Sequence, residues 1–404
     1  MTVQICKYFS AVFIFPFIFC LYWIGNGKKQ LGHNFSINVT LESNPKIVLL
    51  WTPLVTSEHW HMAGKFDTSQ PFELLNCENT NCILTRNRSK LEQADAVLFY
   101  IRNEVHSKSL DRPENRRSNQ MFIISAMSPS NYYSNASDEY KTNSKLWATY
   151  NTISKDYFNW TMSFQSISDI LNPYGMFEKH LVKNQSRINR DYWSGKTKGA
   201  FWAVSHCVTT SKREKLAVEL AKYIPVEMSG GCQFKEIKHF NNCNRSPEKF
   251  HEVFDSKCEE AVERNFKFYF AFENSLCHEY VSEKFYRTAT MDIIPVVFNG
   301  VDMVKIAPDH SYIDAKDFKT VQELGEYLQK VASDKDLYNS YFTWKSEYVA
   351  IYTFGKGFCN LCAKLNDFDP VRDGKVLKDV RKWHHEDCNK TMKSFSFLRR
   401  NTKP

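Results

Sequence analysis

Short apolar runs alternate with polar, helix-forming segments along most of this 404-residue chain. Runs of consecutive apolar residues are typical of strands that are buried on both faces of a parallel sheet. Helical periodicity is clearest over 212–223, where Leu216, Leu220 and Tyr223 fall on one face. The expected strands are 47–51, 94–100, 121–126, 200–205, 267–272 and 293–298, and the expected helices are 212–223, 281–291 and 321–331.

The alternation of strands and helices predicts an α/β protein with parallel sheets. The globular part exceeds one typical domain, so we expect two lobes, at 45–195 and 196–368. Residues 25–44 are rich in Asn, Gly and Ser and predict a short stem, whereas 369–404 predicts a charged tail.

An uncharged, mostly apolar run occupies residues 8–24, between Lys7 and Lys28. It ends in Leu-Tyr-Trp-Ile rather than in the small residues of a signal-peptide cleavage site, which favours an uncleaved signal anchor. The run is short for a transmembrane helix and therefore fits the thinner membranes of the early secretory pathway. We expect a single-pass type II membrane protein with residues 1–7 in the cytoplasm.

Eight N-x-S/T sequons and ten of the twelve cysteines follow this anchor. Glycans are added and disulfides persist in the lumen of the secretory pathway, so both features support a lumenal globular part. The sequon at Asn159 lies in an aromatic-rich segment, and we expect it to be too buried for a glycan. The expected glycosylation sites are Asn34, Asn38, Asn87, Asn135, Asn184, Asn244 and Asn389.

The net charge of +8 is moderate and forms no long basic run, so nucleic-acid binding is not indicated. A generally basic surface suits anionic partners, although the need for solubility explains it equally well.

Residues 267–300 read as a strand, a polar loop, a helix and a second strand, which together make a βαβ unit. Ligands of parallel sheets bind beyond the carboxyl ends of the strands, where helix N-termini favour anions. A lysine there suits a phosphate, and carboxylates or an amide suit sugar hydroxyls. A solvated loop and helix face explains the same residues without a ligand. The polar residues at this place are Glu273, Asn274, Ser275, Glu283 and Lys284.

The segment FAFENSLCHEYVSEKFYRTATMDIIPVVF (270–298) resembles the signature of the α-1,3-fucosyltransferases. In that family FxFENS, a Tyr-Val/Ile-Thr-Glu-Lys run and a Pro-Val-Val strand form the GDP-fucose site; here Ser282 stands where Thr is usual. Further matches extend over 47–362. The resemblance implies the GT-B architecture, with two Rossmann-like lobes facing a cleft. It also implies an inverting Golgi enzyme whose donor is GDP-fucose and whose acceptor is a GlcNAc-containing glycan on protein or lipid.

The resemblance also assigns a donor site. The run Val204-Ser205-His206 corresponds to Val-Ser-Asn in the family, and Arg213 matches an arginine that contacts the donor diphosphate. A guanidinium can bind two phosphate oxygens at once, although an ordinary helix-surface arginine is the alternative. Arg213 and Lys284 would neutralise the leaving GDP, as a metal ion does in other enzymes. The implied donor residues are Ser205, Arg213, Glu273, Asn274, Ser275, Tyr280, Glu283 and Lys284.

We expect no tightly bound cofactor and no metal ligands, while stimulation by Mn²⁺ or Mg²⁺ stays open. Two D-x-D triplets, at 334–336 and 367–369, have the form that holds Mn²⁺ in glycosyltransferases of another fold. Neither triplet follows a hydrophobic strand, so we interpret both as surface charge.

The acceptor side departs from the family pattern. Met127 stands where the family has a glutamate that is thought to be the general base, and a thioether cannot take a proton. The segment FNWTMSFQSISDILNPYG (158–175) matches FNWTLSYRRDSDI…PYG, but Gln165 replaces an arginine and Ile167 an acid. The acceptor-side candidates that remain are Arg102, Ser128, Asp169 and Tyr174.

Three alternatives follow from the altered base position. The enzyme is active with a relocated base, for which Glu58, His59 and His61 are candidates. Otherwise it is a slow transferase that relies on leaving-group stabilisation, or a weak or inactive paralogue that still binds GDP-fucose as a lumenal partner. A homodimer is compatible with all three.

Related fucosyltransferases tie an N-terminal cysteine pair to a C-terminal C-x-x-C. A lone C-x-x-C without a second pair or matched histidines argues against zinc. Cys232 and Cys243 are plausible partners on spacing, whereas Cys207, Cys258, Cys277 and Cys388 are unassigned. The resemblance implies two disulfides that join Cys77 and Cys82 to Cys359 and Cys362.

Overall fold

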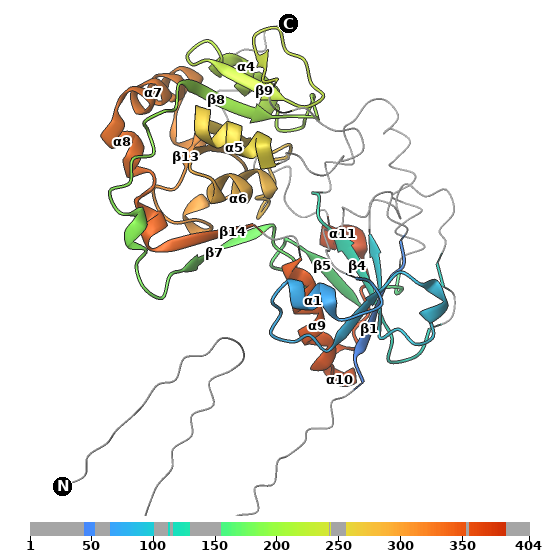
Figure 1. The fold of residues 1–404 in the computed structure, drawn as a ribbon. Coiled ribbons are helices and arrows are strands. Elements are labelled where there is room, and N and C mark those ends of the chain that lie inside the picture. The colour runs from blue at the N-terminus through green and yellow to red at the C-terminus, as the bar shows by residue number, and fades with distance from the viewer. Residues whose placement is uncertain are drawn as a thin grey trace, which may run out of the picture. The chain divides into compact units, whose positions relative to one another are not determined.

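The computed structural model describes residues 44–52, 65–100, 112–113, 116–129, 155–241, 243, 256–352 and 355–384. All of them belong to one unit, Ser43–Pro404. They form two six-stranded parallel sheets and one two-stranded antiparallel ladder (Figure 1). The expectation of an α/β protein with parallel sheets is therefore confirmed.

The first sheet has the strand order β2-β1-β3-β4-β5-β6. Its order reverses between β1 and β3, and β3 and β4 are buried along their whole length, as expected of central strands. Its strands are β1 (Lys46–Leu50), β2 (Cys82–Thr85), β3 (Ala96–Tyr100), β4 (Met121–Ala126), β5 (Trp160–Ser163) and β6 (Ile170–Leu171). Two short helical segments, α1 (Gln70–Leu74) and η1 (Arg88–Lys90), flank β2 in the chain.

The second sheet has the strand order β10-β9-β8-β11-β12-β13. Helix α4 buries Leu216 and Leu220, in agreement with the predicted face. The strands are β8 (Lys198–Ala203), β9 (Val226–Ser229), β10 (Lys238–His239), β11 (Phe266–Phe272), β12 (Ile294–Phe298) and β13 (Ile313–Asp314). The helices are α4 (Arg213–Leu220), α5 (Ser256–Asn265), α6 (Glu283–Thr290), α7 (Val321–Ser333) and α8 (Lys335–Ser340).

The chain passes between the sheets twice, and the two passages pair with each other. Strand β7 (Gly175–Lys179) leads out of the first sheet, and β14 (Tyr348–Tyr352) runs antiparallel to it on the way back. The short helices η4 (Gln185–Arg187) and η7 (Thr343–Ser346) follow the same two passages. The carboxylate of Asp292 joins them, because Arg187 donates to it from the first passage and Lys345 from the second.

After β14 the chain returns to the first sheet as α9 (Lys356–Asn366), which packs against β6 and β1. Helices α10 (Pro370–Asp373) and α11 (Val380–His384) follow. Val380 and Trp383 are buried in a hydrophobic cluster with side chains of β3 and β4. These two apolar side chains of the segment predicted as a charged tail therefore complete a core.

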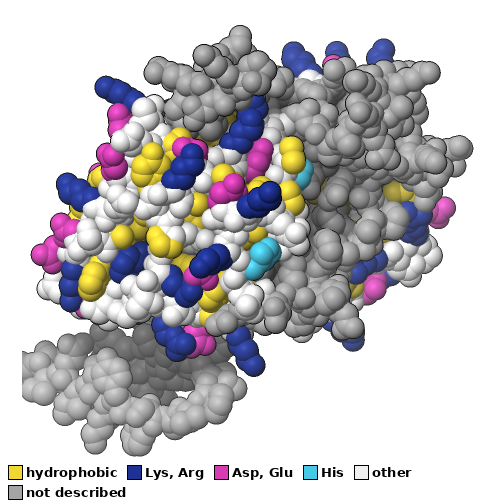
Figure 2. Space-filling model, turned by 90° about the horizontal axis from the view of Figure 1, so that it is seen from above, with side chains coloured by type: hydrophobic (Ala, Val, Ile, Leu, Met, Phe, Trp, Pro, Cys, Tyr) yellow, Lys and Arg dark blue, Asp and Glu magenta, His cyan; other side chains and the backbone are white. Residues whose placement is uncertain are grey.

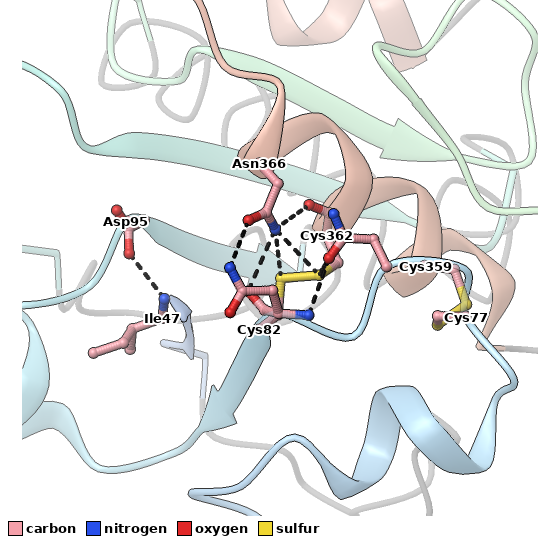
Figure 3. Close-up of a disulfide and its surroundings, with 9 residues drawn as sticks. Ile47, Cys77, Cys82, Asp95, Cys359, Cys362 and Asn366 are labelled. Atoms are coloured by element: carbon pink, nitrogen blue, oxygen red, sulfur yellow. Dashed lines mark hydrogen bonds between the residues drawn. A yellow bond between two sulfur atoms is a disulfide. The ribbon is translucent and has the colours of Figure 1, made fainter. Parts of the chain in front are cut away.

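Two disulfides attach α9 to the segments before and after the start of β2 (Figure 3). Beside them, Asn366 accepts a hydrogen bond from Asn81 Nδ2 (3.1 Å) and donates to the carbonyl of Cys362 (2.9 Å). The pairs are Cys77–Cys359 and Cys82–Cys362, which confirms both pairings that the resemblance implied.

Two further disulfides lie on the second sheet. Cys207 pairs with Cys232, and Cys243 pairs with Cys258. The suggested pairing of Cys232 with Cys243 is therefore wrong. Cys207 follows β8 and Cys232 follows β9, and because these strands are neighbours, their carboxyl ends bring the two cysteines together.

Three sequons fall within the described residues. Asn159 is buried, and its Nδ2, the atom that would carry a glycan, donates to the carbonyl of Lys375 (3.1 Å). This burial agrees with the expectation for Asn159. Asn87 is exposed and Asn184 half-buried, and each caps a short 3₁₀ helix through Oδ1.

Several predicted features lie outside the described residues. Among the residues that the structure describes, no helix is both long and apolar enough to cross a membrane. The features outside are the anchor 8–24, most of the stem, Glu58, His59, His61, Arg102, Cys388 and the sequons at Asn34, Asn38, Asn135, Asn244 and Asn389.

Replacing Cys77, Cys82, Cys359 and Cys362 together by serine is expected to lower the free energy of unfolding by about 2–5 kcal/mol, because either crosslink alone would still close the same very long loop of the unfolded chain. The two bonds span 282 and 280 residues, whereas Cys243–Cys258 spans 15. Denaturant unfolding compares this variant with one in which only Cys243 and Cys258 are replaced by serine. A larger loss for the short loop would contradict the loop-closure explanation.

Candidate active site

The carboxyl edge of the second sheet has a point where the strand order reverses. The chain runs from β8 outward to β10, returns at β11 and continues to β13, so β8 and β11 are neighbours with connections leading in opposite directions. Ligands of open parallel sheets bind at such switch points. The loops that start there are 204–212, after β8, and 273–282, after β11.

Glu273 closes the second of these loops from inside the protein. It is 1% exposed, and its carboxylate accepts hydrogen bonds from the N–H of Ser282 (2.7 Å) and from the Ser282 hydroxyl (2.8 Å). Ser282 is also the N-cap of α6. The loop therefore begins and ends at one buried hydrogen-bonded group, which places the N-terminus of α6 at the switch point.

Lys284 is a positively charged residue next to this loop, and it forms ion pairs with two carboxylates. Its Nζ lies 3.1 Å from Glu273 Oε2 and 2.9 Å from Glu283 Oε1. Burial alone would lower the pKa of Lys284, but the two carboxylates outweigh it and raise the pKa. Burial raises the pKa of Glu273, against the attraction of Lys284. Lys284 thus remains charged and is paired with both carboxylates.

Arg213 lies beneath the two loops rather than on the helix surface. It is 3% exposed, its Nη1 donates to the carbonyl of Phe272 (2.7 Å) and its Nη2 to that of His206 (3.3 Å). Its Nε is buried and has no hydrogen-bond partner among the described residues. Because both terminal nitrogens already bind backbone carbonyls, the arginine joins the end of β11 to the loop after β8. Burial lowers its pKa from a value so high that it stays charged.

The other predicted donor residues lie around the same two loops. Asn274 is buried, its carbonyl accepts from Ser211 N–H (3.2 Å), and its side-chain Oδ1 has no partner within the described part of the chain. Ser275 is buried against Thr210, while Ser205 is exposed. Tyr280 is buried. The structure thus brings the whole predicted donor set to one edge of the sheet. One buried polar atom each of Arg213 and Asn274 has no hydrogen-bond partner among the described residues.

Met127 immediately follows β4 at the carboxyl edge of the first sheet. Its sulfur accepts a hydrogen bond from Asn172 Nδ2 (3.1 Å), and its carbonyl accepts one from the hydroxyl of Tyr174. Burial, followed by the nearby Tyr280, raises the pKa of Tyr174 well above its ordinary value, so its phenol stays protonated. The position has hydrogen-bond donors but, in Met127, only a weak acceptor.

The remaining acceptor-side candidates have mainly structural contacts. Asp169 Oδ2 accepts from both the N–H (2.9 Å) and the hydroxyl (2.8 Å) of Thr161 in β5. Tyr174 is buried, and Ser128 is half-buried beside Met127. Of the predicted acceptor residues that the structure describes, Asp169 is exposed, and Ser128 is the one that directly follows the base position.

One contact at the site was not anticipated from the sequence. The carboxylate of Glu279, in the loop after β11, accepts hydrogen bonds from the N–H (2.8 Å) and the hydroxyl (2.6 Å) of Ser166, in the loop after β5. These residues lie 113 positions apart, and no motif links them. A sequence signal that could have pointed to Glu279 is its place directly before Tyr280 in the signature.

The D-x-D triplets take part in helix capping. Asp334 caps α8, and Asp369 caps α10. Among the described residues, no group of three or more His, Cys, Asp or Glu side chains is placed to hold a metal ion. On the face in Figure 2, acidic and basic side chains are interspersed among the coloured residues.

Two family models match the chain: the fucosyltransferase N-terminal model over residues 43–175, and the C-terminal model of glycosyltransferase family 10 (fucosyltransferase) over 193–383. This chain belongs to the fucosyltransferases of glycosyltransferase family 10. The resemblance read from the signature is thereby confirmed, and the second model spans both switch-point loops of the fucosyltransferase.

Characterised relatives resemble the fucosyltransferase over most of its length. Alpha-(1,3)-fucosyltransferase C of Drosophila melanogaster is 32% identical over 366 residues, which cover 85% of this chain and 78% of the relative. Alpha-(1,3)-fucosyltransferase fut-6 of Caenorhabditis elegans is 33% identical over 78% of this chain and 75% of its own. A crystal structure of an α1,3-fucosyltransferase with GDP-fucose is 13% identical, has a TM-score of 0.46 and covers 84% of this chain and 94% of its own.

Replacing Ser282 by alanine is expected to destabilise the protein by about 1–3 kcal/mol, because the buried Glu273 loses its hydroxyl donor. Ser282→Thr is the matched control, since threonine keeps the hydroxyl and stands at this position in the family signature. Denaturant unfolding of both variants checks this. If the alanine variant is as stable as the threonine variant, Glu273 does not depend on the hydroxyl.

Proposed function

We propose that this fucosyltransferase transfers fucose from GDP-fucose, with inversion at the anomeric carbon, to a GlcNAc-containing glycan of a glycoprotein or glycolipid in α-1,3 linkage. The observation that carries the proposal is the donor cluster at the switch point, with Lys284 between Glu273 and Glu283 and Arg213 beneath. The names of the relatives, α-(1,3)-fucosyltransferases, support the linkage.

The donor diphosphate is placed at the N-terminus of α6. The helix dipole favours an anion there, and Lys284 adds a positive charge. Arg213 contributes charge from below, where its buried Nε has no hydrogen-bond partner among the described residues. Both cations are held before the donor arrives, so they stabilise the charge that develops on the departing GDP without reorganising.

The acceptor hydroxyl requires a base as it attacks the anomeric carbon, and Met127 cannot serve. We assign the base to Glu58, His59 or His61, which follow β1, two strands from β4 in the first sheet. Loss of a positioned base costs about 10²–10⁴-fold in rate. A slow transferase that depends on leaving-group stabilisation is therefore the consequence if none of the three residues acts.

The two sheets form the facing halves of a GT-B enzyme in this proposal, with donor and acceptor loops at their carboxyl edges. Residues 8–24 anchor the protein in the Golgi membrane, and the catalytic part is lumenal. The disulfides of the described residues support an oxidising compartment. Stimulation by Mn²⁺ or Mg²⁺ is measurable by adding each ion after chelation.

Met127 favours a second candidate function. A chain that keeps the donor cluster but lacks the base glutamate is suited to bind GDP-fucose without turning it over. Such a protein would act as a lumenal partner of other transferases.

A transfer assay tests the proposal. The soluble part, from residue 28 onward, is secreted from a eukaryotic host and incubated with GDP-fucose and GlcNAc-terminated, LacNAc and chitobiose-core acceptors. We expect one added fucose by mass spectrometry, removable by an α-1,3-specific fucosidase. Lack of product in a sample that binds GDP-fucose would favour the non-catalytic partner, and lack of donor binding would refute both candidates.

Replacing Met127 by glutamate is expected to raise turnover if the enzyme is slowed by its missing base, by up to about 10²–10⁴-fold. Asn172 Nδ2, which now donates to the sulfur, would donate to the new carboxylate. Met127→Gln is the matched control, because it has the same length and an acceptor oxygen but no basicity. Equal rates for the two variants would indicate that the base lies elsewhere.

A further inference from the structure

One contact between the donor loop after β11 and the loop after β5 is made by a carboxylate that neither the signature nor the base position explains. Glu279 Oε2 accepts from the N–H of Ser166 (2.8 Å), and Glu279 Oε1 accepts from its hydroxyl (2.6 Å). Both carboxylate oxygens are used, and hydrogen bonds to an ionised acceptor are stronger than neutral ones.

The backbone of Glu279 is held in a conformation that residues with a side chain rarely adopt. Its φ is +58°, in the left-handed region. Such conformations persist where the surroundings determine them, and they cluster at functional sites. Strain at this residue is a second observation, independent of the hydrogen bonds, that the contact is more than an incidental surface pair.

The neighbouring residue strengthens the same junction. The ring of Tyr280 lies 5.2 Å from that of Phe164 and 6.1 Å from that of Tyr174. The hydroxyl of Tyr174 in turn donates to the carbonyl of Met127. A continuous set of contacts therefore leads from Glu279 and Tyr280 to the acceptor position.

Each of the two loops is also fixed internally, so a displacement of one is passed to the other. Glu273 and Ser282 close the donor loop. In the other loop, Ser163 accepts from the N–H of Gln165 (3.1 Å), and its hydroxyl lies 2.7 Å from that of Ser168. Glu279 is the hydrogen-bonded link between two such closed loops.

We infer that Glu279 is a positioning residue that couples donor and acceptor binding. With the donor in place, the loop after β11 holds Ser166 and the segment around Met127 in the arrangement that binds the acceptor glycan. Because coupling is reciprocal, the acceptor strengthens donor binding by the same factor. The inference rests on the proposed function, since it uses the same donor and acceptor loops.

The experiment measures coupling without turnover. GDP serves as the donor-site probe, and a LacNAc oligosaccharide serves as the acceptor. The Kd of the acceptor is determined by calorimetry with and without saturating GDP. For the wild type we expect GDP to tighten acceptor binding by at least about fivefold, the lower end of typical couplings. For Glu279→Ala we expect the ratio to fall to about one, with the Kd of GDP alone unchanged.

Three further variants separate positioning from general destabilisation. Ser166→Ala removes only the hydroxyl donor and should reduce the coupling in part. Glu279→Gln keeps one acceptor oxygen and should restore part of it. Glu236→Ala, an exposed glutamate of the second sheet region, is the control and should retain full coupling.

The outcomes distinguish the inference from the proposed function. If the Glu279→Ala variant has the same thermal unfolding midpoint as the wild type and still shows the wild-type coupling, the inference is overturned and the proposed function is not affected. A wild type that binds neither GDP nor acceptor overturns the proposed function, and the inference with it. In the active enzyme, Glu279→Ala should raise the acceptor KM more than it lowers kcat.

Discussion

A buried negative charge governs the donor side of this fucosyltransferase. Glu273 is almost fully removed from solvent, and a charge in that environment must be compensated by hydrogen bonds and an opposite charge. Ser282 supplies two donors and Lys284 the cation, and together they close the loop and start α6. A Cβ on Gly300 would lie 2.8 Å from the carbonyl of Cys277, so only glycine lets the loop after β12 pack here. Lys284, Tyr280 and Glu279 are placed by this closed loop.

Different interactions connect the two chain segments that pass between the sheets. The β7–β14 ladder pairs the outgoing and returning chain, and Asp292 binds basic side chains from both passages. Beyond the second passage, two disulfides fasten α9 to the first sheet. The C-terminal part of the catalytic region is therefore a component of the N-terminal sheet. This explains why the cysteine pairs lie about 280 residues apart in sequence.

The proposed donor and acceptor sides differ in the polar groups that they contain. The loops after β8 and β11 contain two buried or half-buried cations, and Arg213 Nε and Asn274 Oδ1 have no hydrogen-bond partner among the described residues. The acceptor position instead contains Met127, with Asn172 donating to its sulfur. The thioether of Met127 is a weak acceptor for the amide of Asn172, whereas a carboxylate at this position would be a strong one.

Local pattern was sufficient to predict the strands and helices whose burial is continuous or periodic, such as β11, β12 and α4, because side-chain period depends only on the local backbone. It also indicated Glu273, Asn274, Ser275, Glu283 and Lys284, since they lie in a single βαβ unit, whereas Ser205, Arg213 and Tyr280 were implied by the family resemblance. Strand β5 escaped prediction because the polar Thr161 and Ser163 interrupt its apolar run, and Asp169 and Ser168 satisfy their hydroxyls only after folding. The pairing of Cys207 with Cys232 depends on which strands are neighbours, and the contact of Glu279 with Ser166 joins loops that belong to two different sheets. Strand order is set by packing between distant segments, so the tertiary structure alone decided them.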